Sequence, residues 1–180
     1  MRLKLNQLGF SLIEILVAIA IIITATTVVV AILSSSFRGI SKSNVVEEVR
    51  QNGNRAITQM SRTIQFAESF QGAFINDSTY DLACTASAGK NYEYIKLNSG
   101  GRLVTLSCNN LSMGSTTVTP LIDTTRVSVV EGSCSFTCTQ QSVDDSPIIG
   151  INFELSQAGE TAPEKSAKIP FSTTVKMRNR

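Results

Sequence analysis

The feature that most constrains this chain is a long apolar run close to its start. The nineteen residues from Ile15 to Leu33 carry no charge, and a helix of that length is sufficient to cross the hydrocarbon core of a bilayer. Arg2 and Lys4 lie on the short side before the run, and positive residues favour the cytoplasmic side. Arg38 and Lys42 follow the run and weaken this bias. The very short first segment still favours a single span with the later part of the chain outside the cytoplasm.

Charge and composition argue against several classes of function. Arg2 and Lys4 supply the whole formal net charge of +2, so the remaining residues are neutral and predict no basic surface for nucleic acid. The chain contains no His and no Trp, and His is the most common general base and metal ligand. We therefore expect no enzyme, no metal site and no cofactor. Asp144-Asp145 before Ser146-Pro147 is interpreted as a solvated turn.

An acidic residue near the start of the apolar run needs an explanation. A secretory signal peptide would share the basic start, and Ser34-Ser35-Ser36 would be a weak cleavage site. The run is longer than a usual signal core, however, and it contains Glu14. An ionised carboxylate at the middle of a membrane helix costs about 2.5 kcal/mol. Glu14 therefore either has a charged partner or lies at the depth of the lipid headgroups.

The segment from Gly9 to Glu14 (GFSLIE) follows a short basic leader, Met1 to Gly9, and opens the apolar run. Together they resemble the cleavage motif of type IV prepilins and type II secretion pseudopilins. The resemblance implies that a prepilin peptidase, a membrane aspartic protease, cuts between Gly9 and Phe10 on the cytoplasmic side. It further implies N-methylation of Phe10, and pairing of Glu14 with the N-terminal amine of a neighbouring subunit in a filament.

The chemistry of these residue types fits those roles. Glycine lacks a Cβ and enters a tight protease cleft in an extended conformation. After the cut, the amine of Phe10 and the carboxylate of Glu14 both lie in apolar surroundings, where a buried charge needs an oppositely charged partner. Pairing between subunits would set the axial register of a helical bundle, which is a well-attested use of buried polar pairs.

Beyond the span, the apolar pattern narrows to a stripe. Apolar or small residues recur at steps of three and four with charged residues between them, which predicts an amphipathic helix with one packing face. The stripe comprises Val46, Val49, Gly53, Ala56, Met60, Ile64 and Ala67. Together with the span, the helix is expected from Phe10 to about Phe70. Ser34–Ser36, Gly39 and Gly53 are candidate bends or breaks.

The remainder predicts antiparallel strands. Asn98-Ser99-Gly100-Gly101 between Tyr92–Leu97 and Arg102–Ser107 predicts a hairpin, because glycine readily adopts the positive φ of a tight turn. Residues Ile169–Met177 alternate as in a half-exposed strand, and Pro170 predicts that this strand begins at a sheet edge. Asn76 to Asn91 is expected to be a polar loop. The other predicted strands are Thr116–Thr119, Arg126–Glu131, Ser135–Thr139 and Ile148–Leu155.

The four cysteines predict disulfides in an oxidising compartment, with unpaired thiols as the alternative. Cys134 and Cys138 would lie about 13 Å apart in a continuous strand, too far to bond to each other. They pair only if the chain between them turns; otherwise each must reach Cys84 or Cys108. Of the three connectivities we favour Cys84–Cys108 with Cys134–Cys138. A zinc site is disfavoured because paired CxxC spacing and His are both absent from the sequence.

The predicted fold class is α+β, with a long N-terminal helix packed on an antiparallel β-sheet head, as in pilins. We expect a basic leader at 1–9, a transmembrane and assembly helix at 10–34, an amphipathic helix at 35–70 and a strand-rich head at 71–180. Two shorter segments, Arg50 to Arg62 and Phe171 to Asn179, are similar to minor pilins of the W type and pseudopilins of the J type.

The resemblance implies a structural subunit, a minor pilin or pseudopilin, of a type IV pilus or type II secretion filament. Its expected partners are the prepilin peptidase, other pilin or pseudopilin subunits and, before assembly, the inner membrane. It would cross that membrane once, with the head outside the cytoplasm, and no nucleic acid is expected. The alternative is a membrane- or filament-tethered binding module for adhesion, DNA uptake or recognition of an exported protein. The nearest residues to a binding cluster, interpreted first as hairpin residues, are Tyr80, Lys90, Tyr92, Tyr94 and Lys96.

Overall fold

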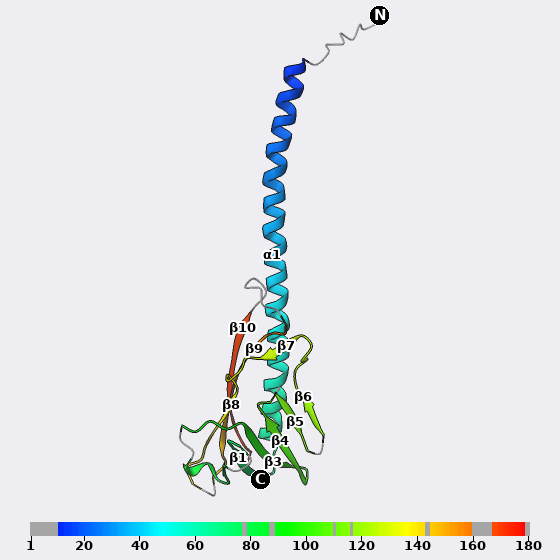
Figure 1. Ribbon diagram of the computed structural model, residues 1–180. Coiled ribbons are helices and arrows are strands. Elements are labelled where there is room, and N and C mark those ends of the chain that lie inside the picture. The colour runs from blue at the N-terminus through cyan, green and yellow to red at the C-terminus, as the bar shows by residue number, and fades with distance from the viewer. Residues whose placement is uncertain are drawn as a thin grey trace, which may run out of the picture. The chain divides into compact units, whose positions relative to one another are not determined.

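The predicted α+β class is confirmed by a computed structural model (Figure 1). The structure describes residues 11–76, 79–86, 89–109, 111–115, 117–142, 145–159 and 167–178. One long helix, α1 (Leu12–Gln65), precedes the strands. These are β1 (Ser69–Phe74), β2 (Tyr80–Asp81), β3 (Tyr94–Ser99), β4 (Arg102–Ser107), β5 (Ser112–Gly114), β6 (Val118–Pro120), β7 (Val127–Val129), β8 (Ser135–Thr139), β9 (Ile148–Gln157) and β10 (Lys168–Lys176), with a 3-10 turn η1 (Cys84–Ala86).

The chain divides into two compact units between Ser41 and Lys42. In the first unit, the described residues up to Ser41 belong to α1 and its N-cap, and none of them is buried. The second unit contains the rest of α1 and all of the strands, which Figure 1 shows gathered along this part of the helix. The second unit is called the head below.

Helix α1 is continuous, so the breaks considered at Ser34–Ser36, Gly39 and Gly53 do not occur. A glycine inside a helix costs only about 1 kcal/mol relative to alanine, which neighbouring helical hydrogen bonds and packing can offset. Neither Gly39 nor Gly53 adopts a positive φ. The β-branched residues between Thr24 and Val30 are also helical, as expected for a segment that must satisfy its own backbone.

The predicted packing stripe is confirmed within the head, with one shift at its start. Val49, Gly53, Ala56, Met60 and Ile64 are buried, as predicted. The stripe begins at Val45, which is buried, whereas the predicted first member, Val46, is only half-buried. The cause is helical geometry: Val45 precedes Val49 by one turn of about 3.6 residues and therefore lies on the same face.

The sequence predicted that the helix ends near Phe70, but it ends at Gln65. The backbone that follows cannot continue the helix, because Ser69–Phe74 forms β1 and pairs antiparallel with β3. The carbonyl of Gln65 accepts a hydrogen bond from the backbone N–H of Arg178 at 3.2 Å. The C-terminal segment therefore satisfies a backbone group that the end of a helix leaves unpaired.

A six-stranded antiparallel sheet has the order β2-β1-β3-β4-β5-β6. At its centre, β3 and β4 form the predicted hairpin, with Ser99 opposite Arg102. Gly100 and Gly101 have φ values of 60° and 71°. Positive φ at both central residues is typical of the type I′ turn, whose twist matches that of the strands. The loop predicted at Asn76–Asn91 contains two short elements, β2 and η1.

A four-stranded antiparallel sheet has the order β10-β9-β7, and β8 also pairs with β9. Side chains along β10 alternate between exposed and half-buried, as predicted. The edge position predicted from Pro170 is confirmed as well: among the described residues β10 pairs with β9 alone, with Pro170 opposite Glu154. The two sheets meet where Tyr92 and Phe136 exchange two backbone hydrogen bonds, each of 2.8 Å.

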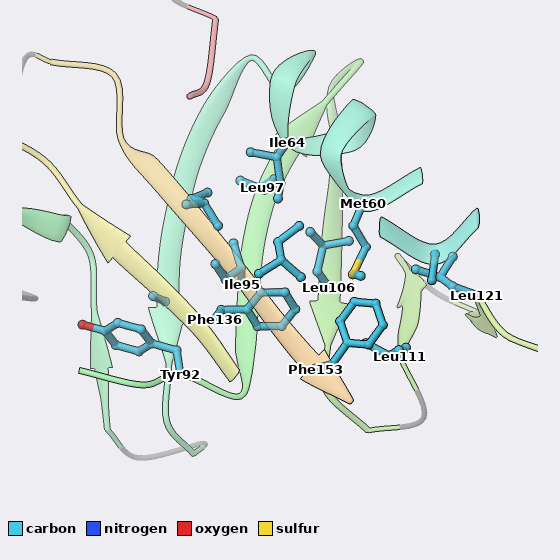
Figure 2. Close-up of a cluster of buried hydrophobic side chains, with 14 of the residues drawn as sticks. Met60, Ile64, Tyr92, Ile95, Leu97, Leu106, Leu111, Leu121, Phe136 and Phe153 are labelled. Atoms are coloured by element: carbon cyan, nitrogen blue, oxygen red, sulfur yellow. The ribbon is translucent and has the colours of Figure 1, made fainter. Parts of the chain in front are cut away.

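One core joins the helix to both sheets. In Figure 2, the side chains of Met60 and Ile64 from α1 lie with those of Ile95, Leu97 and Leu106 from the six-stranded sheet. Phe136 and Phe153 from the other sheet join the same cluster. These side chains are almost fully buried, and burial of each large apolar side chain contributes about 1.5–3 kcal/mol. The stripe on α1 is therefore an integral part of the hydrophobic core.

Candidate functional site

The sequence places the candidate assembly site at the start of the apolar helix. Gly9 and Phe10, the predicted cleavage and methylation positions, lie outside the described residues. Glu14 lies in the first turn of α1, and its side chain is exposed. The carbonyl of Ser11 accepts hydrogen bonds from the N–H groups of Glu14 at 3.0 Å and Ile15 at 3.3 Å, and so begins the helix. An acidic side chain in a first turn is favoured by the partial positive charge of a helix N-terminus.

The apolar side chains that follow Glu14 are exposed on every side of the helix. Among the described residues, α1 is the helix that is long and apolar enough to cross a membrane. In its most apolar segment, none of the residues is buried. Contiguous apolar surface of this extent marks a site that lipid or another protein covers. The large apolar side chains that are exposed between Leu12 and Ile40, two of them before Glu14, are Leu12, Ile13, Ile15, Leu16, Val17, Ile19, Ile21, Ile22, Ile23, Val28, Val29, Val30, Ile32, Leu33, Phe37 and Ile40. This segment is a candidate membrane anchor.

Three threonine hydroxyls inside this segment are satisfied by the helix itself. Thr24 Oγ1 donates to the carbonyl of Ile21 at 2.9 Å, and Thr26 Oγ1 donates to that of Ile22 at 2.7 Å. Thr27 Oγ1 donates to the carbonyl of Thr24 at 2.8 Å. Because each hydroxyl uses a carbonyl of the preceding turn, the segment presents no unsatisfied threonine donor to a hydrocarbon environment.

The four cysteines form two disulfides, but the favoured pairing is wrong. Cys84 is bonded to Cys138, and Cys108 is bonded to Cys134. Cys134 directly precedes β8 and Cys138 lies within it. The extended backbone of β8 keeps these two sulfurs too far apart to bond to each other. Each instead reaches a segment that the sheets bring alongside, with Cα–Cα distances of 5.4 and 5.5 Å.

The disulfides connect β8 at both of its ends to distant parts of the head. The bonded cysteines are separated by 54 and 26 residues. In the chain-entropy model, loops of these lengths correspond to about 4 and about 3.5 kcal/mol of stabilisation. Disulfides of this kind indicate an oxidising compartment.

A glycine of α1 allows the four-stranded sheet to approach the helix closely. A Cβ at Gly53 would overlap the ring of Phe171 on β10. That ring is stacked on Phe153 of β9, with ring centroids 5.2 Å apart. Gly53 is therefore a contact position for the sheet, which explains a helix-interior residue that is unfavourable for the helix alone.

Polar contacts attach the loop before β7 to two half-buried residues of the helix. Arg126 Nη1 lies 2.6 Å from Glu48 Oε1, and the backbone N–H of Asp123 donates to Asn52 Oδ1 at 3.0 Å. The hydrogen bond with Glu48 raises the pKa of Arg126. Hydrogen bonds from Thr125 hold the pKa of Asp123 below its ordinary value. Because Arg126 and Asp123 are exposed, we assign the loop a positioning role rather than a large share of stability.

The aromatic and basic residues considered for binding are mostly engaged within the head. Tyr92 is buried, and its hydroxyl donates to Asp81 Oδ2 at 2.5 Å. Lys90 Nζ also donates to Asp81 Oδ2, at 2.9 Å. These two hydrogen bonds, the one from Tyr92 first, lower the pKa of Asp81, and the pairing with Asp81 raises the pKa of Lys90.

The other residues considered for binding, Tyr80, Tyr94 and Lys96, also lie within the strands of the head. Lys96 Nζ lies 4.2 Å from the centroid of the Phe74 ring, a cation–π distance. The same ring is stacked on Tyr80, with centroids 5.2 Å apart. Tyr94 lies on β3 and is half-buried. These side chains connect neighbouring strands, in agreement with their interpretation as hairpin residues.

The acidic dipeptide considered for an enzyme is only partly described. Asp144 is outside the described residues, and the N–H of Asp145 donates to the carbonyl of Ser142 at 3.1 Å. Among the described residues, no group of three or more His, Cys, Asp or Glu side chains is placed to hold a metal ion.

The sequence did not indicate two structural contacts of the head. Gly53 was expected to be a candidate break, although its place in the apolar stripe could have indicated a close contact. The Asp81–Tyr92 hydrogen bond joins residues eleven apart and depends on tertiary pairing of β1 with β2 and β3.

A scan against protein-family models finds no match, and neither a search of curated proteins nor one of solved structures finds a similar protein.

Proposed function

We propose that this chain is a structural subunit, a minor pilin or pseudopilin, of a type IV pilus or type II secretion filament. In this proposal a prepilin peptidase removes Met1 to Gly9, and the apolar part of α1 holds the subunit in the inner membrane until it assembles. The head lies outside the cytoplasm, where the two disulfides form.

The observation that carries the proposal is the division of one helix into two kinds of surface. Residues Leu12 to Ile40 expose large apolar side chains all around, whereas Val45 to Ile64 bury a single stripe in the head. A membrane anchor alone accounts for the first surface. A filament subunit accounts also for the GFSLIE motif and for an acid in the first helical turn.

Glu14 has a defined task in this proposal. Its carboxylate enters the apolar surroundings of a helical bundle and is neutralised by the N-terminal amine of Phe10 in a neighbouring subunit. Because a buried charge without a partner is strongly unfavourable, the pairing restricts how far one subunit advances along the next. The exposed position of Glu14 leaves its carboxylate accessible to such a partner.

The first experiment determines the N-terminus of the membrane-associated protein by intact and peptide mass spectrometry. We expect the chain to begin at N-methylated Phe10. A chain that begins near Ser35 would instead identify a secretory signal peptide. A chain that retains Met1 would leave an uncleaved membrane anchor, and either result would overturn the proposal.

A second experiment separates processing from assembly. Glu14→Ala should still be cleaved after Gly9 but should be lost from sheared or purified filaments. Glu47→Ala is the matched control, because Glu47 is also an exposed glutamate on α1. We expect the control to enter filaments normally. Equal incorporation of both variants would contradict the role assigned to Glu14.

A further inference from the structure

The two disulfides of the head differ in their access to solvent. The side chains of Cys84 and Cys138 are 2% and 1% exposed. Cys108 and Cys134 are only partly buried and pack at the margin of the core. Because thiol–disulfide exchange requires a thiolate to reach a sulfur atom, access is one of the factors that set its rate. The same head therefore contains one closed and one open disulfide.

The open disulfide borders a pocket of about 490 Å³. Cys108 and Cys134 line it together with Glu93, Tyr94, Asn109 and Glu131, among others. The volume is sufficient for a small thiol. The described part of the chain thus presents a defined approach to the Cys108–Cys134 bond from solvent.

The walls of this pocket are held by backbone hydrogen bonds. The N–H of Cys108 donates to the carbonyl of Glu93 at 2.9 Å. Residues Val130 to Ser133 form a tight turn closed by a 3.0 Å bond from the N–H of Ser133 to the carbonyl of Val130. Gly132, at the third position, has a positive φ of 70°, as in a type II turn. These backbone hydrogen bonds do not depend on the disulfide, so Cys108 and Cys134 would keep their backbone partners after the bond is reduced.

Charge is one-sided around the open disulfide. Among the described residues that line the pocket, the charged ones are Glu93 and Glu131, and both are exposed. An approaching anion is repelled by these carboxylates and an approaching cation is attracted. The pocket can therefore distinguish thiols of equal size by their charge.

We propose that Cys108–Cys134 is the thiol-exchange site of the head. Its pocket admits small thiols, and Glu93 and Glu131 favour thiolates with a cationic substituent over those with an anionic one. Cys84–Cys138 is closed to exchange in the folded state. The proposal goes beyond the filament function and does not rest on it.

The chemistry has two balanced steps. The thiolate of a small thiol attacks one sulfur of the Cys108–Cys134 bond, forms a mixed disulfide and releases the other cysteine as a thiolate. A second thiolate then attacks the mixed disulfide, which releases the remaining cysteine. Two electrons pass to the protein disulfide, and the two small thiols are oxidised to one small disulfide.

The first test measures which bond opens first. The full chain, in a non-ionic detergent, is treated with cysteamine, quenched with iodoacetamide at intervals and analysed by peptide mass spectrometry. We expect Cys108 and Cys134 to be alkylated at least about tenfold faster than Cys84 and Cys138. In denaturant the two rates should converge. Equal rates in the folded state, or earlier opening of Cys84–Cys138, would overturn the exchange site.

The second test uses three thiols of equal chain length and different charge: cysteamine, 2-mercaptoethanol and 2-mercaptoethanesulfonate. Rates are compared at equal thiolate concentration with those of the Glu93→Gln/Glu131→Gln variant. At low ionic strength we expect the cation-to-anion rate ratio to fall about three- to tenfold in the variant. Glu47→Gln, which is remote in sequence from the pocket, should leave the ratio unchanged. An unchanged ratio in the double variant would refute the charge discrimination but not the exchange site.

Discussion

The two parts of helix α1 have the same backbone conformation but opposite relations to their surroundings. From Leu12 to Ile40 the large apolar side chains are exposed on all sides, and the polar threonines bond back to their own helix. From Val45 to Ile64 the buried residues form one stripe, with charged residues on the opposite face. Both parts share the internal hydrogen bonds of one helix, and tertiary packing of the buried stripe further stabilises the second part.

The largest expected effect comes from placing a charge in the second part. Met60→Arg buries an unpaired cation in the core, where Met60 is fully buried. We expect the free energy of unfolding of the head to fall by more than about 4 kcal/mol. Chemical denaturation followed by circular dichroism tests this result. A folded head of near-normal stability would show that the stripe is not part of the core.

The same substitution in the first part should have a different consequence. Ile22→Arg places a cation where Ile22 is 63% exposed, and we expect membrane insertion to become less favourable by about 3 kcal/mol. The stability of the head should not change. Thr58→Arg, on the exposed face of the second part, is the matched control and should affect neither quantity. Membrane fractionation and thermal unfolding together test the prediction, and loss of head stability in Ile22→Arg would break the comparison.

Two glycines in the same helix provide a smaller but sharper test. Gly53→Ala should destabilise the head by about 1–3 kcal/mol, because its Cβ would overlap the Phe171 ring. Gly39→Ala has open space around the new methyl group and should stabilise the helix by about 0.5–1 kcal/mol. Thermal unfolding of the head and helix content by circular dichroism measure the two effects. Equal behaviour of the two variants would contradict a contact role for Gly53.

The last prediction concerns a pH dependence of the stability of the head. Hydrogen bonds from Tyr92 and Lys90 lower the pKa of Asp81 in the folded state, so its stabilisation is complete above the unfolded pKa of about 3.9. The stabilisation is lost as the pH falls through the lower folded pKa. Asp81→Asn should reduce the free energy of unfolding by about 1–2 kcal/mol at pH 6. The difference from the unmodified chain should shrink towards pH 2.5. A constant difference across this range would exclude the ionised carboxylate as the cause.

Local sequence patterns predicted the elements whose structure depends on neighbouring residues. The stripe around Met60 follows from helical periodicity, the β3–β4 hairpin from Gly100-Gly101, and the edge position of β10 from Pro170. Strand β1 was missed because Ser69–Phe74 directly follows a helical pattern and was partly included in it. Strand β5 has only three residues, Ser112–Gly114, which carry little periodicity.

The disulfide connectivity required information that the sequence does not contain. Spacing alone disfavoured a Cys134–Cys138 bond in an extended strand, and β8 is extended. The choice between Cys84 and Cys108 as partners depends on which end of β8 each approaches. That arrangement follows from the contact of β8 with η1 and from the Tyr92–Phe136 bridge, both of which are long-range. The resemblance of GFSLIE to a prepilin cleavage motif stays a prediction, because Gly9 and Phe10 lie outside the described structure.

The edge strand β10 has a consequence for crowding. Lys168, Pro170 and Lys176 are exposed along this edge, and proline offers no N–H to an incoming strand. Such residues prevent neighbouring sheets from joining edge to edge and growing into an amyloid-like ribbon. Subunits concentrated in one membrane by their apolar helices would bring many heads close together. In the proposed filament, the composition of β10 would oppose aggregation of neighbouring heads and leave the exposed apolar helix as the contact between subunits.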